Sequence, residues 1–158
     1  MKIASIDKHP IMRAGLSVFL KTHFKGITVI EAECLYSYLA TDVFHAPDII
    51  IIGLAEESAG IDMGILGRMM QQNPDTSFVV YDGRPQADLA VACLQAGVKG
   101  YLLKSNNLNE LVQCMESVIN GHHYICNEFE SIAKEECHEL LAKSKLNTWC
   151  IGANRSGI

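Results

Sequence analysis

The chain has 158 residues, which suits one domain of ordinary size around a single hydrophobic core. Its residues are 49% apolar and 20% charged, a composition that excludes a disordered protein. The formal net charge is −5, with 13 basic and 18 acidic residues, so the chain as a whole has no positive field for nucleic acid.

Short β-rich runs alternate with amphipathic helical stretches along the chain. The expected strands lie at 2–6, 27–32, 48–53, 77–82 and 100–104. The first helix follows residue 6, with an apolar face made of Met12, Leu16, Phe19 and Leu20. Such alternation predicts an α/β fold, a parallel sheet with helices on both faces.

The helices after the fourth and fifth strands differ in pattern. The stretch 86–96 is apolar nearly all round; we expect Leu89, Ala92, Cys93 and Ala96 to face the core. The helix after residue 107 has one apolar face, made of Leu108, Leu111, Val112, Met115, Val118 and Ile119. Asn107 with Glu110 predicts a capping box, and Gly121 ends the helix.

The pattern changes after residue 121, so we expect a first domain at 1–121 and a separate segment at 122–158. Residues 122–126 should be a short connector. A further helix follows, capped by Asn127 and Glu130, with an apolar stripe made of Phe129, Ile132, Ala133, Cys137, Leu140 and Leu141. The tail after about residue 146 has no clear period and should be partly irregular.

Six cysteines are scattered without a CxxC pair, at positions 34, 93, 114, 126, 137 and 150. We expect buried free thiols and no disulfide framework. His122, His123 and Cys126 lie close together, and Cys137 adjoins His138, but neither spacing supplies the four ligands of a structural zinc site. We therefore expect no metal and no cofactor.

Charged residues interrupt the first 25 positions, including Asp7, Lys8, Arg13 and Lys21. This pattern fits neither a signal peptide nor a membrane span. We expect a cytoplasmic protein with no membrane partner.

Four segments of the chain resemble the receiver domain of bacterial response regulators, in the NarL/FixJ branch that precedes a LuxR-type DNA-binding domain. They are MKIASIDKHPIMRAGL, PDIIIIGL, SFVVYD and LQAGVKGYLLKS, within residues 2 to about 120. The resemblance implies a doubly wound, flavodoxin-like sheet of five parallel strands in the order 2-1-3-4-5. The segment after residue 121 would be an extra helical unit.

The resemblance also implies a phosphorylation site at the carboxyl ends of the first, third and fourth strands. In that family an aspartate that ends the third strand accepts a phosphoryl group, and an acidic pair that ends the first strand helps to hold Mg²⁺. Here the acceptor position is Gly53, and the acidic pair is Asp7 and Lys8. The hydroxyl position is Asp82, and only Lys104 matches the family lysine. Glycine has no nucleophilic oxygen, so phosphotransfer at this position is lost.

These replacements change the charge of the pocket. The family's three carboxylates and one lysine sum to −2, whereas Asp7, Asp82, Lys8 and Lys104 sum to zero. We expect no Mg²⁺ and hypothesise that the two lysines pair internally with the two aspartates. Two alternatives stay open: drift, with the lysines in solvent, or an acceptor moved to Glu56, Glu57 or Asp82.

A receiver that does not switch can still bind through its surface. Candidate interface residues are Ile11, Ala14 and Val18 on the first helix, and Ala87, Val91 and Leu94 on the helix after the fourth strand. The second group could instead pack against this chain's own extra helix. Tyr101 matches the switch aromatic of the resembled family.

Residues 131–147 distantly resemble the opening helix of a LuxR-type helix-turn-helix, but no basic recognition helix follows. Direct DNA binding by this chain is therefore not expected. We expect a non-enzymatic, atypical receiver of two-component signalling that regulates transcription through a protein partner or as a homodimer. The alternatives are a DNA-binding regulator with a divergent C-terminal unit and a small-ligand sensor using the modified pocket.

Overall fold

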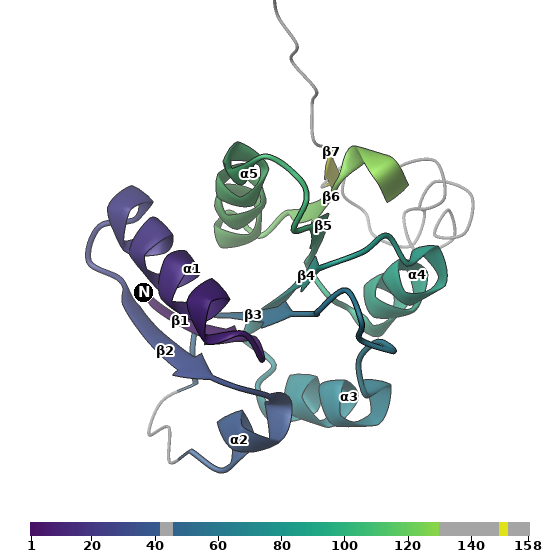
Figure 1. Ribbon diagram of the computed structural model, residues 1–158, viewed down its shortest axis with the longest axis horizontal. Helices are drawn as coiled ribbons and strands as arrows, with labels where there is room; N and C mark the ends of the chain where they lie inside the picture. The colour runs from purple at the N-terminus through teal and green to yellow at the C-terminus, as the bar shows by residue number, and fades with distance from the viewer. Residues whose placement is uncertain (42–45, 130–148, 152–158) are drawn as a thin grey trace, which may run out of the picture. The chain divides into compact units, whose positions relative to one another are not determined.

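The computed structural model of the chain describes residues 1–41, 46–129 and 149–151 (Figure 1). It divides the chain into two compact units, Met1–Gly83 and Arg84–Ile158. The division into 1–121 and 122–158 stays a prediction.

The first unit contains a four-stranded parallel sheet. Its strands are β1 (Lys2–Ile6), β2 (Thr28–Ala32), β3 (Ile49–Gly53) and β4 (Ser77–Asp82). They pair in the order β2-β1-β3-β4. The first four positions of the predicted order are thereby confirmed.

Both faces of this sheet need cover, because the four isoleucines of β3 alternate between them and each is at most 2% exposed. Helix α1 (Pro10–His23) lies on one face, and α2 (Leu35–Leu39) and α3 (Met63–Gln72) lie on the other (Figure 1). Pro10 starts α1, where its missing N–H costs no hydrogen bond. The Asp62 carboxylate caps α3 by accepting the Ile65 N–H at 2.9 Å.

The second unit contains α4 (Ala87–Ala96), β5 (Gly100–Leu103), α5 (Leu108–Ile119), β6 (His123–Ile125), the 3₁₀ turn η1 (Asn127–Phe129) and β7 (Trp149–Ile151). Strands β5, β6 and β7 pair in parallel. Gly97, with φ of 106°, and Gly121, with φ of 79°, follow α4 and α5 in the left-handed conformation.

The predicted capping box of α5 is half right. Asn107 is the N-cap and accepts the Asn109 N–H at 2.8 Å. Glu110 instead accepts a hydrogen bond from the Asn106 side chain, also at 2.8 Å. The helix start was therefore readable from the sequence, but the partner of Glu110 was not.

One prediction for the C-terminal segment was wrong, because the expected connector contains β6. The tail, expected to be partly irregular, contains β7 at 149–151, and its other residues lie outside the described ranges. Each of these two strands is only three residues long, and backbone pairing with a neighbouring strand stabilises such a segment without any period in its sequence. The predicted helix from 127 begins as η1, and its remainder at 130–148 lies outside the described residues.

The core face of α4 also differs from the prediction. Ala90, Cys93 and Leu94 are buried, whereas Ala96 is exposed. Positions 90, 93 and 94 form one stripe at helical spacing. Because nearly every position of α4 is apolar, periodicity could not identify which stripe faces inward. None of the helices in the described part of the chain is long and apolar enough to cross a membrane.

Candidate functional site

The carboxyl ends of β1, β3 and β4 meet at one edge of the parallel sheet in the first unit. Ile6 is in register with Ile52, and Gly53 with Tyr81. Asp7 and Lys8 therefore follow β1 beside Gly53, and Asp82 ends β4 nearby in the same sheet. This is the edge at which ligands of doubly wound sheets bind.

The Asp7 carboxylate fills the space beside Gly53. A Cβ placed on Gly53 would overlap Asp7 Oδ2 and lie only 2.8 Å from Asp7 Cγ. Asp7 is 4% exposed, and its Oδ1 accepts the His9 N–H at 2.8 Å. Arg13 of α1 donates to the Asp7 carbonyl at 2.6 Å and so fixes the backbone as well. The packing of this edge therefore requires glycine at position 53 as long as Asp7 keeps its position.

Lys8 pairs with Glu57 of the β3–α3 loop, and this corrects the hypothesis that Lys8 pairs with Asp7 or Asp82. The hydrogen bond from Lys8 is the main cause that lowers the pKa of the Glu57 carboxyl. Both side chains are largely exposed, at 49% and 63%. An exposed carboxylate is a less costly partner for a lysine than a buried one, since neither group loses its water. The two acids after the third strand were the signal for this pair.

Asp82 is 0% exposed, and its neighbour Gly83 leaves no room for a side chain. A Cβ on Gly83 would lie 2.7 Å from the backbone nitrogen of Glu56 and 2.9 Å from the carbonyl oxygen of Leu54. The β3–α3 loop therefore passes directly over the end of β4. Lys104 belongs to the second unit, and its pairing with Asp82 stays a prediction.

The residues of this edge do not fit the Mg²⁺ that the resemblance implies. Of the expected carboxylate ligands only Asp7 is present, because Lys8 replaces its neighbour and Gly53 replaces the acceptor. One Asp7 oxygen is already committed to the His9 N–H. Hard cations need several oxygen ligands. Within the described ranges, no group of three or more His, Cys, Asp or Glu side chains could hold a metal.

Tyr101, the expected switch aromatic, is fully buried in the second unit. Its ring packs edge to face on Phe129, with 5.3 Å between ring centroids and an interplanar angle of 87°. A role in switching stays a prediction.

The candidate interface residues divide into two groups. On α1, Ile11 is 80% exposed and Val18 is 67% exposed, and Ala14 between them is also exposed. On α4, Ala87 and Val91 are half-buried, but Leu94 is 6% exposed and belongs to the core. Leu94 is therefore removed from the candidate surface.

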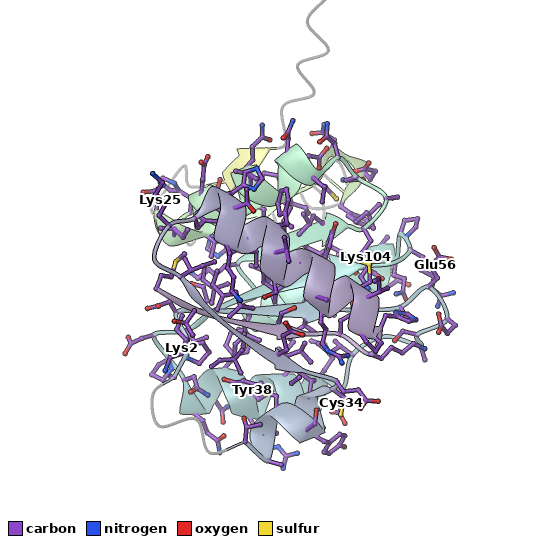
Figure 2. The ribbon with its side chains drawn as sticks, turned by 60° about the vertical axis from the view of Figure 1, so that its left-hand side comes forward. Lys2, Lys25, Cys34, Tyr38, Glu56 and Lys104 are labelled. Atoms are coloured by element: carbon purple, nitrogen blue, oxygen red, sulfur yellow. The ribbon has the colours of Figure 1, made fainter. Side chains whose placement is uncertain are left out.

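Sequence reasoning missed Cys34 as a surface thiol. Cys34 is the N-cap of α2, and its sulfur accepts the Ser37 N–H at 3.4 Å. This hydrogen bond is the main cause that lowers the pKa of the thiol. Figure 2 shows Cys34 at the surface, whereas Cys93, Cys114 and Cys126 are buried as expected. The sequence signal would have been an N-cap residue before α2, but cysteine is not among the residues that are usually preferred as N-caps.

Comparison with known proteins identifies relatives of this chain. The family model described as response regulator receiver domain matches residues 3–116. The chain is 31% identical over 125 residues to a Bacillus subtilis protein named uncharacterized transcriptional regulatory protein YhcZ. That alignment covers 78% of this chain and 56% of YhcZ, so the chain spans little more than half of this relative.

Solved structures show the same fold. The isolated receiver domain of RcsB from Salmonella enterica serovar Typhimurium, determined in the presence of phosphomimetic BeF₃⁻, superposes with a TM-score of 0.72 at 17% identity. This match covers 83% of the chain and 96% of that domain. A structure of two RcsB dimers bound to two parallel DNAs matches with a TM-score of 0.71 at 18% identity, covering 92% of this chain and 78% of that one. The α/β receiver fold is confirmed.

Proposed function

This chain belongs to the family of response regulator receiver domains, and from that premise we propose that it works without phosphorylation, by contacting another protein in transcriptional regulation. The observation that supports the proposal most strongly is the Asp7 carboxylate packed against Gly53. A phosphoryl acceptor at position 53 is absent, and a side chain there would need Asp7 to move. In this proposal the chain is a cytoplasmic, non-enzymatic regulator of bacterial two-component signalling.

The proposed contact surface is the exposed apolar stripe of α1, formed by Ile11, Ala14 and Val18. Two large apolar side chains exposed at 80% and 67% on one helix face favour burial against a partner. We propose a second copy of this chain as that partner, because the RcsB structure named above contains dimers. Ala87 and Val91 on α4 are a secondary candidate surface.

Phosphorylation independence is tested with acetyl phosphate and Mg²⁺. After incubation with radiolabelled acetyl phosphate, the chain should contain no covalent label, and ¹⁹F NMR should detect no bound BeF₃⁻. The RcsB receiver is the positive control for BeF₃⁻, because its structure was determined in the presence of that ion. Stable label on the chain would contradict the proposal, and mapping it to Glu56, Glu57 or Asp82 would identify a moved acceptor.

The contact surface is tested by light scattering after size-exclusion chromatography. Ile11→Glu and Val18→Glu should each convert the dimer to monomer, because a charge would be buried at the interface. Leu39→Glu is the matched control, since Leu39 is 47% exposed on α2 and outside the α1 stripe. A monomeric wild-type chain, or a dimer that tolerates both α1 variants, would contradict the proposed dimer.

A gel-shift assay on promoter DNA separates this proposal from a DNA-binding regulator. We expect no sequence-specific shift from the chain alone. Tight binding that weakens steeply with salt would favour the DNA-binding alternative.

A further inference from the structure

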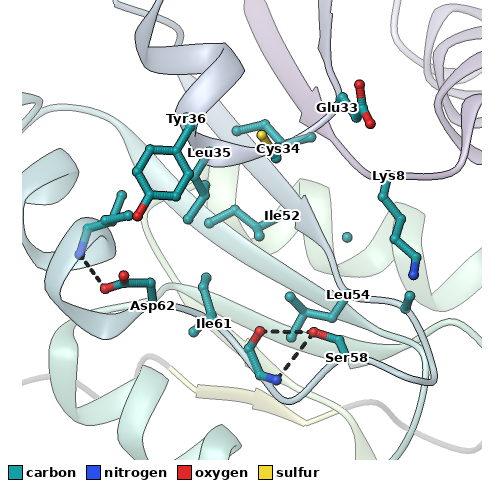
Figure 3. A pocket seen from close by; sticks show the side chains of 15 residues that line it. Lys8, Glu33, Cys34, Leu35, Tyr36, Ile52, Leu54, Ser58, Ile61 and Asp62 are labelled. Atoms are coloured by element: carbon teal, nitrogen blue, oxygen red, sulfur yellow. Dashed lines mark hydrogen bonds between the residues drawn. The ribbon is translucent and has the colours of Figure 1, made fainter.

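A cavity of about 290 Å³ opens beside Gly53 in the first unit. It lies between the β2–α2 junction and the β3–α3 loop. In Figure 3, Leu35 and Tyr36 form one side, Leu54 and Ile61 form the other, and Ile52 lies between them. The lining is mainly apolar, as in sites for small molecules.

Gly53 contributes bare backbone to this cavity. The position that a Cβ of residue 53 would take is occupied by the Asp7 carboxylate. At this position the wall of the cavity is therefore backbone, with no side chain from residue 53.

Hydrogen bonds hold both walls in place. In the β3–α3 loop, Ser58 Oγ donates to the Gly60 carbonyl at 2.9 Å and accepts the Gly60 N–H at 3.2 Å. Asp62 then caps α3. On the opposite wall, Cys34 and Ser37 form a reciprocal capping box at the start of α2. Walls fixed in this way lose little conformational entropy when a ligand binds.

The charges around the cavity disfavour an anion. Its lining contains one cation, Lys8, and two carboxylates, Glu33 and Asp62. Lys8 is already paired with Glu57, so its charge is balanced before any ligand arrives. The carboxylates of Glu33 and Asp62 would repel an anionic ligand, whereas an uncharged ligand would bind without this repulsion.

We propose that this cavity is a binding site for a small, uncharged, apolar molecule. At roughly 30 Å³ for each water-sized atom, the volume suits a ligand on the order of ten non-hydrogen atoms, the size of a bicyclic aromatic. The Tyr36 ring, 67% exposed at the rim, gains cover when such a molecule binds. The site is independent of the proposed α1 contact, so either proposal can fail alone.

A pair of probes with the same ring system tests the proposal: naphthalene-1-methanol, which is uncharged, and naphthalene-1-carboxylate, which is anionic. Titration of the full chain, followed by amide NMR shifts, should show the alcohol binding at least about tenfold tighter than the carboxylate. The shifts should centre on Leu35, Gly53 and Ser58. Equal affinity for both probes, no binding of the alcohol, or shifts centred elsewhere would overturn the proposal.

Two tryptophan variants on α2 provide the matched comparison. Leu35→Trp should abolish binding of the alcohol, because Leu35 lines the cavity and the larger ring fills it. Leu39→Trp, one turn later and outside the lining, should bind as the wild type does. If Leu35→Trp fails to fold, Ile61→Trp fills the cavity from the opposite wall. If a folded Leu35→Trp or Ile61→Trp variant bound the alcohol with wild-type affinity, the proposed site would be wrong.

Cys34 supplies an independent readout because its thiol lines the cavity and is exposed. Saturating naphthalene-1-methanol should slow alkylation of Cys34 by iodoacetamide at least about threefold, measured by peptide mass spectrometry. The alcohol should not change the rate in Leu35→Trp. An unchanged rate in the wild-type chain would place the probe outside this cavity.

Discussion

Asp7 and Gly53 are complementary: the Asp7 carboxylate occupies the position in which a side chain of residue 53 would begin. The two residues therefore constrain each other. A carboxylate restored at position 53 alone would meet a buried carboxylate at contact distance, which both sterics and like charge oppose. Reversal to a phosphorylatable receiver would consequently require acidic residues at positions 8 and 53 and a different side-chain position for Asp7.

Gly53→Ala should lower the free energy of unfolding by about 1–3 kcal/mol, because Asp7 must leave its place. The cost should fall by about 1 kcal/mol or more in an Asp7→Ala background, where the obstruction is absent. Urea denaturation of the four chains of this cycle measures the coupling. An equal cost of Gly53→Ala in both backgrounds would contradict the packing described here.

Two other glycines serve as controls for that experiment. Gly67 in α3 has open space around the position that a Cβ would take, so Gly67→Ala should stabilise the chain by about 0.5–1 kcal/mol through helix propensity. Gly83→Ala should destabilise, and Asp7→Ala should not relieve that cost, because the obstructing atoms are backbone atoms of the β3–α3 loop.

Lys8→Met should raise the pKa of the Glu57 carboxyl toward its ordinary value, since the hydrogen bond from Lys8 is the main cause of its lowering. NMR titration of the Glu57 side chain between about pH 2 and 7 measures the change. Stability should barely respond, because the pair is largely exposed. Lys25→Met, remote from Glu57 in sequence, is the control and should leave the titration unchanged. An unaltered curve in Lys8→Met would mean that the pair does not form in solution.

His123 on β6 should make the chain less stable in mild acid. Burial is the main cause that lowers the pKa of this imidazole to about 4, with Lys99 adding to the effect. In the unfolded chain this imidazole is protonated below about pH 6.5, whereas in the folded chain it is protonated only below about pH 4. The free energy of unfolding therefore falls as the pH drops from about 6.5 to about 4.

We expect a loss of roughly 1–2 kcal/mol across that window, allowing for partial exposure of the ring. His123→Gln should remove this part of the pH dependence, measured by urea denaturation at about pH 7, 5.5 and 4. His23→Gln, an exposed position on α1, should retain it. If wild type and His123→Gln lose stability in parallel, another group is responsible.

Cys34 should be alkylated faster than Cys93, Cys114 and Cys126 at neutral pH. It is exposed, and its hydrogen bonds with the backbone N–H and the hydroxyl of Ser37 lower its pKa, whereas burial raises the pKa of Cys126 to about 12. Ser37→Ala should shift the pH–rate profile of Cys34 upward in pH, because it removes the side-chain hydrogen bond and keeps the backbone one. A profile unaffected by Ser37→Ala would show that the backbone hydrogen bond alone sets the thiol's acidity.

The residue pattern alone was enough to predict the fold and the loss of the acceptor. The alternation of β-rich runs and amphipathic stretches predicted the parallel sheet. A strand buried on both faces is a continuous apolar run, as the four isoleucines of β3 show. The residue at the end of β3 is the position of the phosphoryl acceptor. Because residue 53 is glycine, the sequence alone shows that this position has no nucleophile. The N-cap of α5 and the exposed stripe of α1 were readable for the same reason, because local chemistry and helical spacing define them.

The partners of these residues became clear only from the three-dimensional packing. Lys8 could have joined any nearby carboxylate, and only the path of the β3–α3 loop selects Glu57. In α4 the sequence is apolar on every side, so only packing places Leu94 in the core. Strands β6 and β7 depend on backbone hydrogen bonds to a neighbouring strand, which side-chain patterns do not encode. The walls of the cavity beside Gly53 come from the β2–α2 junction and the β3–α3 loop, which lie far apart in the sequence, so only the packing brings them together.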